Sequence, residues 1–206
     1  MPAVADALGL ARRIDDPAGA AITFDDGPHP EGTPAALEAL QEADAQATFF
    51  LCGEQVERYP ALAAEIISAG HAAAVHGYRH RNMLRLAPST FVDDLERGIA
   101  AIEDATGLRP ALYRPPYGIF SYPGMVEVQA RGLRSLLWSR WGHDWRAQRS
   151  GTEIAAEVTR DLDAGDVLLL HDADHYNEPE CWRGTAAALP MVVERIRSAG
   201  LRPVVA

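Results

Sequence analysis

This sequence lacks long apolar runs, clusters of basic residues and cysteine-rich motifs. Its apolar runs fall well short of the roughly 18 residues that a membrane span needs, so we expect no membrane-spanning helix. Asp and Glu outnumber Lys and Arg by 29 to 19, and the basic residues are scattered along the chain. Nucleic acid, which binds clustered positive charge, is therefore not expected as a partner.

Two cysteines occur, Cys52 and Cys181, and they fit neither a disulfide framework nor a metal-binding pair. We expect both to be reduced thiols. The first 17 residues carry several charges where a signal peptide has an apolar core, so the chain as written is expected in the cytoplasm. If the natural protein is longer than this chain, the cell envelope is the expected place instead.

The residues that are present describe one domain of alternating strands and helices, with 48% apolar residues to build its core. Residues 1–19 are predicted to form a short helix or arm. Strands are predicted at 20–24, 47–51, 72–75, 111–113, 134–138, 166–170 and 202–205. Helices are predicted at 33–42, 60–69, 88–106, 123–131, 152–164 and 185–199, with N-caps at Thr33 and Thr152.

This alternation predicts a parallel sheet closed into a barrel, with helices outside, or otherwise an open doubly wound sheet. No glycine-rich nucleotide-binding motif follows any strand, which weighs against a dinucleotide-binding fold. The residues capable of chemistry come just after strands; they are Asp25, Asp26, His76, His80, Arg114, Asp144 and His171. In a parallel barrel these positions share the rim at which active sites are built.

Two adjacent carboxylates, Asp25 and Asp26, end the first predicted strand just before a Gly-Pro turn. Two acids held this close stay ionised together cheaply only when they share a cation or a proton. The alternative is a solvated turn in which one of the two carboxylates caps the following helix.

The histidines His76 and His80 are four residues apart, a spacing that places two imidazoles on one face of a helical turn. Two unrelated surface histidines would show the same spacing. With a carboxylate from Asp25 or Asp26 they form a two-His, one-Asp set, which suits Zn(II) or another divalent first-row metal.

Arg114 and Asp144 each have a plain and a functional interpretation. Arg114 is either a surface cation or the partner that keeps an aspartate ionised. Asp144 is either a solvated acid or the group that orients His171. The loop 171–175, with the sequence HDADH, concentrates four potential ligands, but a second metal site there is the less favoured interpretation.

Five short motifs resemble, in their order and spacing, those of the NodB-type polysaccharide deacetylases, carbohydrate esterase family four. They are Thr23–Pro28, His76 with His80, Arg114–Tyr117, Asp144–Trp145 and Leu169–His171. The resemblance implies a distorted (β/α) barrel of about seven parallel strands with helices outside, and a catalytic domain at residues 20–206. It also implies metal-dependent removal of N-acetyl, or else O-acetyl, groups from an N-acetylglucosamine-containing oligo- or polysaccharide.

For the metal and the base, the resemblance implies particular residues. Asp26, His76 and His80 would bind a divalent metal, with Zn(II) as the first choice and Co(II) as the alternative. Asp25 would be the general base that activates the attacking water, and Arg114 would hold Asp25 in place.

For the acid and the substrate, the resemblance implies a further set. His171 would be the general acid that protonates the leaving amine, and Asp144 would tune it. The main-chain N–H of Tyr117 would stabilise the oxyanion. Trp145 and Leu169 would form the apolar pocket that binds the acetyl methyl group.

Two positions depart from the family pattern. Gly77 stands where the family usually has Ser or Thr, so a hydroxyl that would brace the neighbouring loop is absent. Trp141 stands where another Asp is usual, and it is either a sugar-stacking platform or a packing residue. Both departures concern substrate preference and loop geometry, and the loop 172–183 is expected to carry specificity.

Two other functions compete with a glycan deacetylase. One is a related barrel amidohydrolase that acts on a small non-sugar amide, because a fold does not fix a substrate. The other is a glycan-binding module without activity, which would be expected to lack Asp25, Arg114 or His171; all three are present. The expected partner is an acetylated glycan substrate, and the expected oligomeric state is a monomer.

Overall fold

The computed structural model of the protein describes residues 10–206, so the prediction for residues 1–9 lies outside the described part. The strands are β1 (Gly19–Asp25), β2 (Thr48–Leu51), β3 (Ala72–Val75), β4 (Leu112–Tyr113), β5 (Arg134–Ser135), β6 (Arg140–Trp141), β7 (Val167–His171) and β8 (Arg202–Val204). The α-helices are α2 (Gly32–Glu42), α3 (Gly53–Arg58), α4 (Pro60–Ser68), α5 (Pro88–Thr106), α6 (Tyr122–Ala130), α7 (Gly151–Val158) and α8 (Trp182–Ser198). Two short 3-10 helices are η1 (Met83–Arg85) and η2 (Pro116–Gly118).

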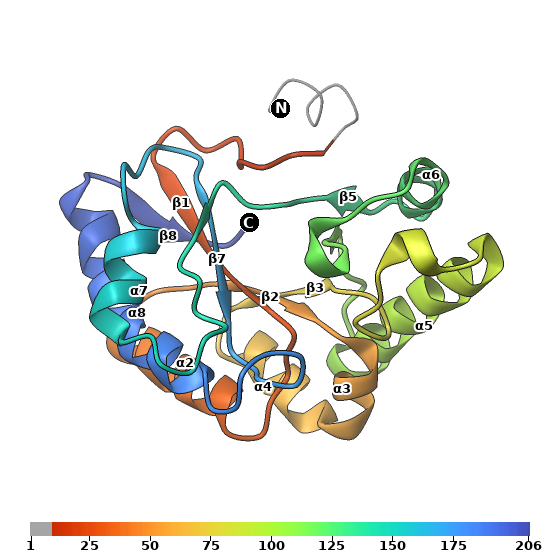
Figure 1. Cartoon of the computed structure of the whole chain (residues 1–206), viewed down its shortest axis with the longest axis horizontal. Coiled ribbons are helices and arrows are strands. Elements are labelled where there is room, and N and C mark those ends of the chain that lie inside the picture. The colour runs from red at the N-terminus through yellow and green to blue at the C-terminus, as the bar shows by residue number, and fades with distance from the viewer. Residues whose placement is uncertain (1–9) are drawn as a thin grey trace.

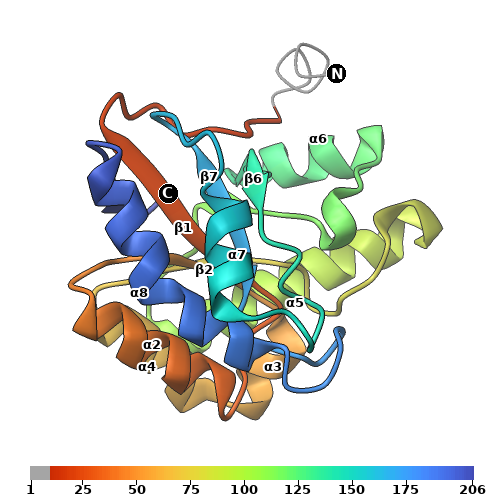
Figure 2. The same ribbon diagram turned by 60° about the vertical axis from the view of Figure 1, so that its left-hand side comes forward.

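The strands form one parallel sheet in the spatial order β5-β4-β3-β2-β1-β7-β6, and β8 pairs with the beginning of β1. The sheet curls, and the helices lie around its outside (Figure 1). A second view shows α2, α7 and α8 together on one side and α5 and α6 on the other (Figure 2). The predicted distorted barrel of about seven parallel strands is confirmed, and its open side lies between the two edge strands β5 and β6.

The segment 10–14 pairs with strand residues on both borders of this open side. Ala11 forms a parallel bridge with Leu136, which follows β5. Arg13 forms an antiparallel bridge with Asp166, which precedes β7. The described part of the predicted N-terminal arm therefore pairs with the sheet and contains no helix, and the predicted domain boundary after this arm stays a prediction.

Side chains of the strands alternate between the helix-covered face and the inside of the curl, because the period of a strand is two. In β1, Ile22 and Phe24 belong to the main core beneath the helices. Ala21 belongs to a smaller apolar cluster inside the curl, so Thr23 and Asp25 point to the inside as well. The first strand therefore carries Asp25 into the interior at its carboxyl end.

The same alternation acts in β7, which pairs with β1 so that His171 lies opposite Asp25. Leu168 and Leu170 pack into the core beneath the helices. Leu169 and His171 consequently face the inside, next to the carboxylate delivered by β1.

The two predicted N-caps, Thr33 and Thr152, are both wrong. α2 begins at Gly32, so Thr33 is not its N-cap; the Thr33 hydroxyl instead accepts the main-chain N–H of His29 at 2.7 Å. α7 is capped by Ser150 rather than by Thr152, since Ser150 and Glu153 form a reciprocal capping box. These are shifts of one or two residues, the level at which a local pattern specifies a helix end poorly.

Two expectations from composition concern the thiols and the membrane. Cys52 and Cys181 are both buried, and neither takes part in a disulfide bond. Within residues 10–206, no helix has both the length and the apolar character needed to cross a bilayer.

Candidate active site

Asp26, His76 and His80 come together at the carboxyl ends of β1 and β3. Oδ1 of Asp26 lies 3.5 Å from Nε2 of His76 and 3.3 Å from Nε2 of His80. Ligand atoms at the usual distances from one tetrahedral zinc-type ion are about 3.3–3.4 Å apart. Oδ1 of Asp26 thus lies at a suitable separation from both histidines, and the ligand atoms of all three residues lie within 4.8 Å of one another.

Hydrogen bonds around this group leave its ligand atoms available. Oδ1 of Asp26 is buried and has no hydrogen-bond partner, whereas Oδ2 accepts from Nδ2 of Asn177 at 2.7 Å. Nδ1 of His76 donates to the carbonyl oxygen of Arg114 at 2.8 Å, which leaves the lone pair on Nε2. Burial lowers the pKa of His80 to about 4, so this imidazole is neutral at pH 7. The donor set therefore fits a divalent metal.

The two histidines lie in a loop after β3, and the helical turn that their spacing indicated is not present. Gly77, between them, has a φ of 87°, in the left-handed region that favours glycine. The carboxylate of Asp94 on α5 accepts the main-chain N–H of Tyr78 at 2.8 Å. Asp94 therefore braces this loop, the task expected of the hydroxyl that Gly77 replaces.

Asp25 is paired with Arg114, which is fully buried. The guanidinium donates to Oδ1 of Asp25 at 2.6 Å, and it also donates to the hydroxyl of Thr23 at 2.9 Å. Two more bonds, to the carbonyls of Leu136 and Leu137, fix its orientation. Burial by itself would raise the pKa of Asp25, but Arg114, together with His76 and His171, outweighs this effect and holds the pKa below the ordinary value. Asp25 is therefore an ionised base at neutral pH.

His171 is oriented by the fully buried carboxylate of Asp144. Nδ1 of His171 lies 3.0 Å from Oδ1 of Asp144, and the main-chain N–H of His171 donates to Oδ2 at 2.6 Å. The hydroxyl of Thr185 donates to the same Oδ2 at 2.8 Å. Burial would lower the pKa of His171, but the adjacent Asp144 raises it to about 9. The imidazole is thus protonated at neutral pH, and its Nε2 faces Oδ2 of Asp26 at 4.0 Å.

These groups line one cavity of about 350 Å³, which we call the catalytic pocket. Its lining residues are Asp25, Asp26, His76, His80, Tyr117, Trp138, Trp145, Leu169, His171, Tyr176 and Asn177. Of the predicted site residues, Arg114 and Asp144 do not line the pocket. They are buried behind Asp25 and His171, the residues with which they pair.

The loop after β7 supplies two residues of the pocket that carry no predicted role. Tyr176 stacks on the ring of His80 with centroids 4.5 Å apart, and its hydroxyl donates to Oε1 of Glu54 at 2.7 Å. Asn177 binds Asp26 as described above. The loop 172–183 was expected to carry specificity, but no pattern marked Asn177, because asparagine is ordinary in turns.

Two residues of the catalytic pocket have left-handed main-chain angles although they are not glycine. They are Asp26, with a φ of 79°, and Tyr117, with a φ of 62°. Such conformations cost energy and persist where the surroundings hold them, often at functional sites. The ring of Tyr117 meets that of His80 edge-on, with centroids 4.5 Å apart.

A second group, His29, Asp174 and His175, also has potential ligand atoms within 4.8 Å of one another. Nε2 of His29 lies 3.1 Å from Oδ1 of Asp174, and its Nδ1 accepts the main-chain N–H of Gly32 at 2.9 Å. A ring that accepts at Nδ1 carries its proton on Nε2, which donates to Asp174. Neither nitrogen of His29 has a lone pair free for a metal, because that of Nδ1 accepts a hydrogen bond and Nε2 carries the proton. This argues against a second metal bound through this histidine.

Asp172, another acid of the same loop, has a structural contact. Its buried carboxylate accepts the hydroxyl of Thr33. A Cβ at Gly27 would lie 2.7 Å from Oδ1 of Asp172, so the glycine of the Asp-Asp-Gly-Pro turn leaves room for this carboxylate. Burial raises the pKa of Asp172 to about 7. The potential ligands of loop 171–175 thus have separate partners: His171 pairs with Asp144, Asp172 with Thr33, and Asp174 with His29.

The fold and the pocket define a parallel α/β barrel protein with a metal-type group at the carboxyl ends of its strands. The chain belongs to the polysaccharide deacetylase family, whose sequence profile matches residues 13–136. The resemblance to the NodB-type deacetylases is thereby confirmed, and with it the enzyme class of carbohydrate deacetylases. Membership of the family implies a divalent metal, which the donor set described above fits.

Relatives and solved structures agree with this assignment. The chain is 34% identical to a chitooligosaccharide deacetylase of Azorhizobium caulinodans over 201 residues, which cover 94% of this chain and 95% of the relative. It is 32% identical to a peptidoglycan-N-acetylglucosamine deacetylase of Bacillus cereus over 88% of this chain and 83% of the relative. The family 4 carbohydrate esterase of Streptomyces lividans, solved in complex with acetate, superposes with a TM-score of 0.82 at 30% identity, covering 91% of this chain and 92% of that one.

Proposed function

We propose that the protein hydrolyses the N-acetyl groups of an N-acetylglucosamine-containing oligo- or polysaccharide. One observation carries the proposal: the unpartnered Oδ1 of Asp26, with His76 and His80 at 3.5 and 3.3 Å, lies between two charged pairs. One pair holds an ionised base and the other a protonated acid. The names of the similar deacetylases support the class of substrate.

Asp26, His76 and His80 would hold the divalent metal, with Zn(II) as the first choice and Co(II) as the alternative. When bound, such an ion supplies Lewis acidity, which lowers the pKa of a coordinated water to about 7 and polarises a carbonyl group. Nitrogen and oxygen donors in a group of three with one open side are typical of catalytic zinc sites.

Asp25 would be the general base. Its Oδ1 is held by Arg114 at 2.6 Å, and the other oxygen, Oδ2, faces the pocket 3.7 Å from Nε2 of His76. Because Arg114 keeps the pKa of Asp25 low, the carboxylate is ionised and ready to accept a proton from the attacking water. Loss of that proton lets the water oxygen bond to the acyl carbon.

His171 would be the general acid. Asp144 fixes Nδ1, so the proton available for transfer is the one on Nε2, the nitrogen that faces the pocket. Its transfer to the amide nitrogen allows the C–N bond to break, and the products are acetate and the free amino sugar. An amine is a poor leaving group without this proton, so Asp144 matters because it keeps His171 protonated.

Three further residues would act on the acyl group itself. The main-chain N–H of Tyr117 would stabilise the oxyanion of the tetrahedral intermediate. Trp145 and Leu169, which both line the pocket, would contact the acetyl methyl group. The ring of Trp145 lies edge-on to that of His171, with centroids 5.8 Å apart, which places this apolar wall beside the general acid.

An acetate-release assay tests the proposal. The purified protein, stripped with a chelator and then reloaded with Zn(II) or Co(II), is incubated with chitooligosaccharides, peptidoglycan fragments, acetylated xylan and small non-sugar amides. We expect metal-dependent acetate release from the N-acetylated glycans. Release from the small amides alone would favour the amidohydrolase, and no release at all would favour a glycan-binding module. Full activity in the stripped protein would overturn the proposed mechanism.

The natural glycan, the cytoplasmic location and the monomeric state remain predictions. The order of activity over the glycan panel identifies the preferred glycan. Size-exclusion chromatography with light scattering determines the oligomeric state.

A further inference from the structure

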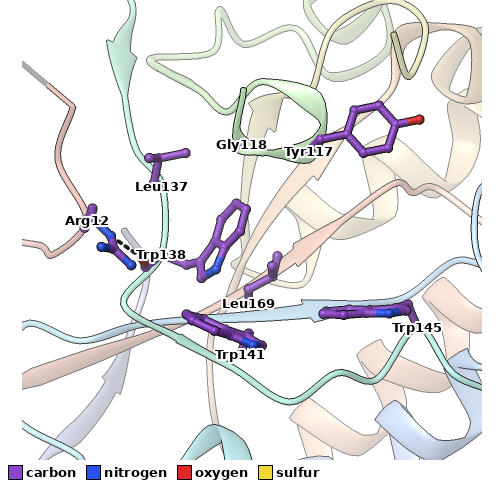
Figure 3. A pocket seen from close by; sticks show the side chains of 8 residues that line it. All are labelled: Arg12, Tyr117, Gly118, Leu137, Trp138, Trp141, Trp145 and Leu169. Atoms are coloured by element: carbon purple, nitrogen blue, oxygen red, sulfur yellow. Dashed lines mark hydrogen bonds between the residues drawn. The ribbon is translucent and has the colours of Figure 1, made fainter. Parts of the chain in front are cut away.

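A second cavity, of about 370 Å³, adjoins the catalytic pocket, and we call it the tryptophan groove (Figure 3). Four residues line both cavities: Tyr117, Trp138, Trp145 and Leu169. The groove adds Arg12, Gly118, Leu137 and Trp141. The two cavities therefore adjoin at these shared residues.

The groove begins at the proposed acetyl site. Trp145 and Leu169, the residues proposed to contact the acetyl methyl group, belong to its wall. Leu169 also lies two residues before His171 on the same face of β7, so the wall starts beside the proposed acid. A chain that continues beyond the methyl carbon of an acetyl group would therefore enter the groove.

The walls of the groove are mainly apolar. Figure 3 shows Trp138 and Leu169 in its middle, with Trp145 at one end and Arg12 at the other. In the same view the hydroxyl of Tyr117 points away from the groove. Apolar walls of this kind, with few polar groups, favour an apolar ligand.

Two of the polar groups at the groove already have hydrogen-bond partners. The indole N–H of Trp141 donates to Nε2 of His143 at 2.9 Å. Nε of Arg12 donates to the carbonyl of Trp138 at 2.9 Å. A sugar ring carries a hydroxyl on most of its carbons and loses affinity where these stay unpaired, whereas an alkyl chain needs no partners. The mainly apolar walls, with these two donors already engaged, favour an acyl chain over a second sugar ring.

We propose that the tryptophan groove binds the acyl chain of the substrate, and that the enzyme prefers glucosamine residues with an N-acyl group longer than acetyl. This inference rests on the proposed deacetylase function and deepens it. The reaction is unchanged: water adds to the acyl carbon, the C–N bond breaks, the nitrogen takes a proton, and a longer carboxylate leaves in place of acetate. No further reactant is needed.

The test compares chitobiose substrates whose amines carry acetyl, propionyl or butyryl groups. The released acid is quantified with the zinc-loaded full chain, and kcat/KM is measured for each substrate. Each methylene group buried in the groove is expected to raise kcat/KM about fourfold. Butyryl has two methylene groups more than acetyl, so the ratio of kcat/KM for butyryl to acetyl is expected to be about 16. A ratio below one would overturn the inference.

Two variants test whether the groove is responsible. Trp141→Ala removes a wall that is 39% exposed, and we expect the butyryl-to-acetyl ratio to fall at least about fourfold. Tyr122→Ala is the matched control, because Tyr122 is an aromatic residue, 73% exposed, that lines neither cavity. An unchanged ratio in Trp141→Ala would overturn the assignment of the groove. Equal loss of activity on acetyl and butyryl substrates, growing with glycan length, would identify a sugar platform instead.

Inhibition of the wild-type enzyme by free carboxylates tests the groove even if Trp141→Ala folds poorly. Hexanoate is expected to inhibit acetate release by the wild-type enzyme at least tenfold more strongly than acetate does; equal inhibition would contradict the inference. Failure of the underlying function looks different. An enzyme that releases acetate but no butyrate refutes the acyl groove alone, whereas an enzyme that releases no acid from any glycan refutes the proposed function.

Discussion

Residues 10–206 contain two groups of one aspartate and two histidines, and the hydrogen bonds of the two groups suit one of them to bind a metal and not the other. In the catalytic pocket, Nε2 of His76 and Nε2 of His80 lie 3.5 and 3.3 Å from Oδ1 of Asp26. In the second group, Nε2 of His29, from the loop after β1, lies 3.1 Å from Oδ1 of Asp174 in the loop after β7, and His175 lies beside them. Residue type and distance therefore do not separate the two groups.

The difference between the groups lies in the hydrogen bonds of their histidines. His76 gives its Nδ1 proton to a carbonyl and keeps a lone pair on Nε2. His29 accepts a main-chain N–H at Nδ1 and must donate from Nε2. The partner of the second ring nitrogen thus decides whether a histidine is a ligand or a structural donor.

The largest expected effect separates the two groups directly. His76→Gln should reduce acetate release to the background rate, because it removes a proposed metal ligand. The matched change His29→Gln should leave both the rate and the bound metal within about twofold. Metal content after dialysis, measured by mass spectrometry, and acetate release check both variants. If His29→Gln also loses the metal, the interpretation of the hydrogen bonds is wrong.

The next largest effect separates Asp25 from its neighbour Asp26. Asp25→Asn should lower kcat by about 10³-fold, within the range for loss of a general base, while metal content stays the same. Asp26→Asn should lower metal affinity as well as activity. Isothermal titration with Zn(II), beside steady-state kinetics, distinguishes the two. Equal metal loss in both variants would contradict separate roles for the two carboxylates.

A smaller effect concerns the pH profile. The pKa of His171 is raised to about 9, so its protonated form is lost as pH rises through that value in the metal-free protein. A cation bound nearby lowers the pKa of His171, so in the metal-loaded enzyme the proton is lost at lower pH. Asp144→Asn removes the charge that raises the pKa, so the alkaline limb of kcat should shift to lower pH than in the wild type. A limb that stays in place, measured at several pH values with zinc-loaded enzyme, would argue against His171 as the acid.

The smallest effect concerns stability. His29→Ala removes the acceptor for main-chain N–H groups at the start of α2, and the free energy of unfolding should fall by about 1 kcal/mol. His175→Ala removes a single bond to the carbonyl of Pro28 and should cost less. Urea denaturation of the metal-free variants measures both. A larger loss for His175→Ala would reverse the roles assigned to the two histidines.

Much of the fold and of the pocket could be predicted because both follow from local patterns. Short apolar strands between helices specify a parallel sheet, and each reactive residue follows a strand. In β1 the two-residue period sends Phe24 to the helices and Asp25 to the inside. The structure accordingly brings together Asp25, Asp26, His76, His80 and His171, as the sequence indicated.

The remaining contacts depend on residues far apart in the chain, which no local pattern reports. Asn177 reaches Asp26 across 151 positions, and Asp94 reaches the loop of the metal histidines from α5. The helical turn expected between His76 and His80 failed for a local reason: Gly77 takes a left-handed conformation that ends regular structure.

The pairing of segment 10–14 with the open side of the sheet affects the order of events during synthesis. Arg13 binds the carboxylates of Asp163 and Asp166 at 3.1 and 2.9 Å. During synthesis the segment is made well before its partner Asp163, which follows Arg13 by 150 positions. Contacts between residues so far apart in sequence form late, because closing a long loop lowers the entropy of the chain before the new contacts stabilise it. Segment 10–14 is therefore among the last parts of the fold to dock, and a nascent chain that stops before Asp163 lacks the ion pairs of Arg13 with Asp163 and Asp166.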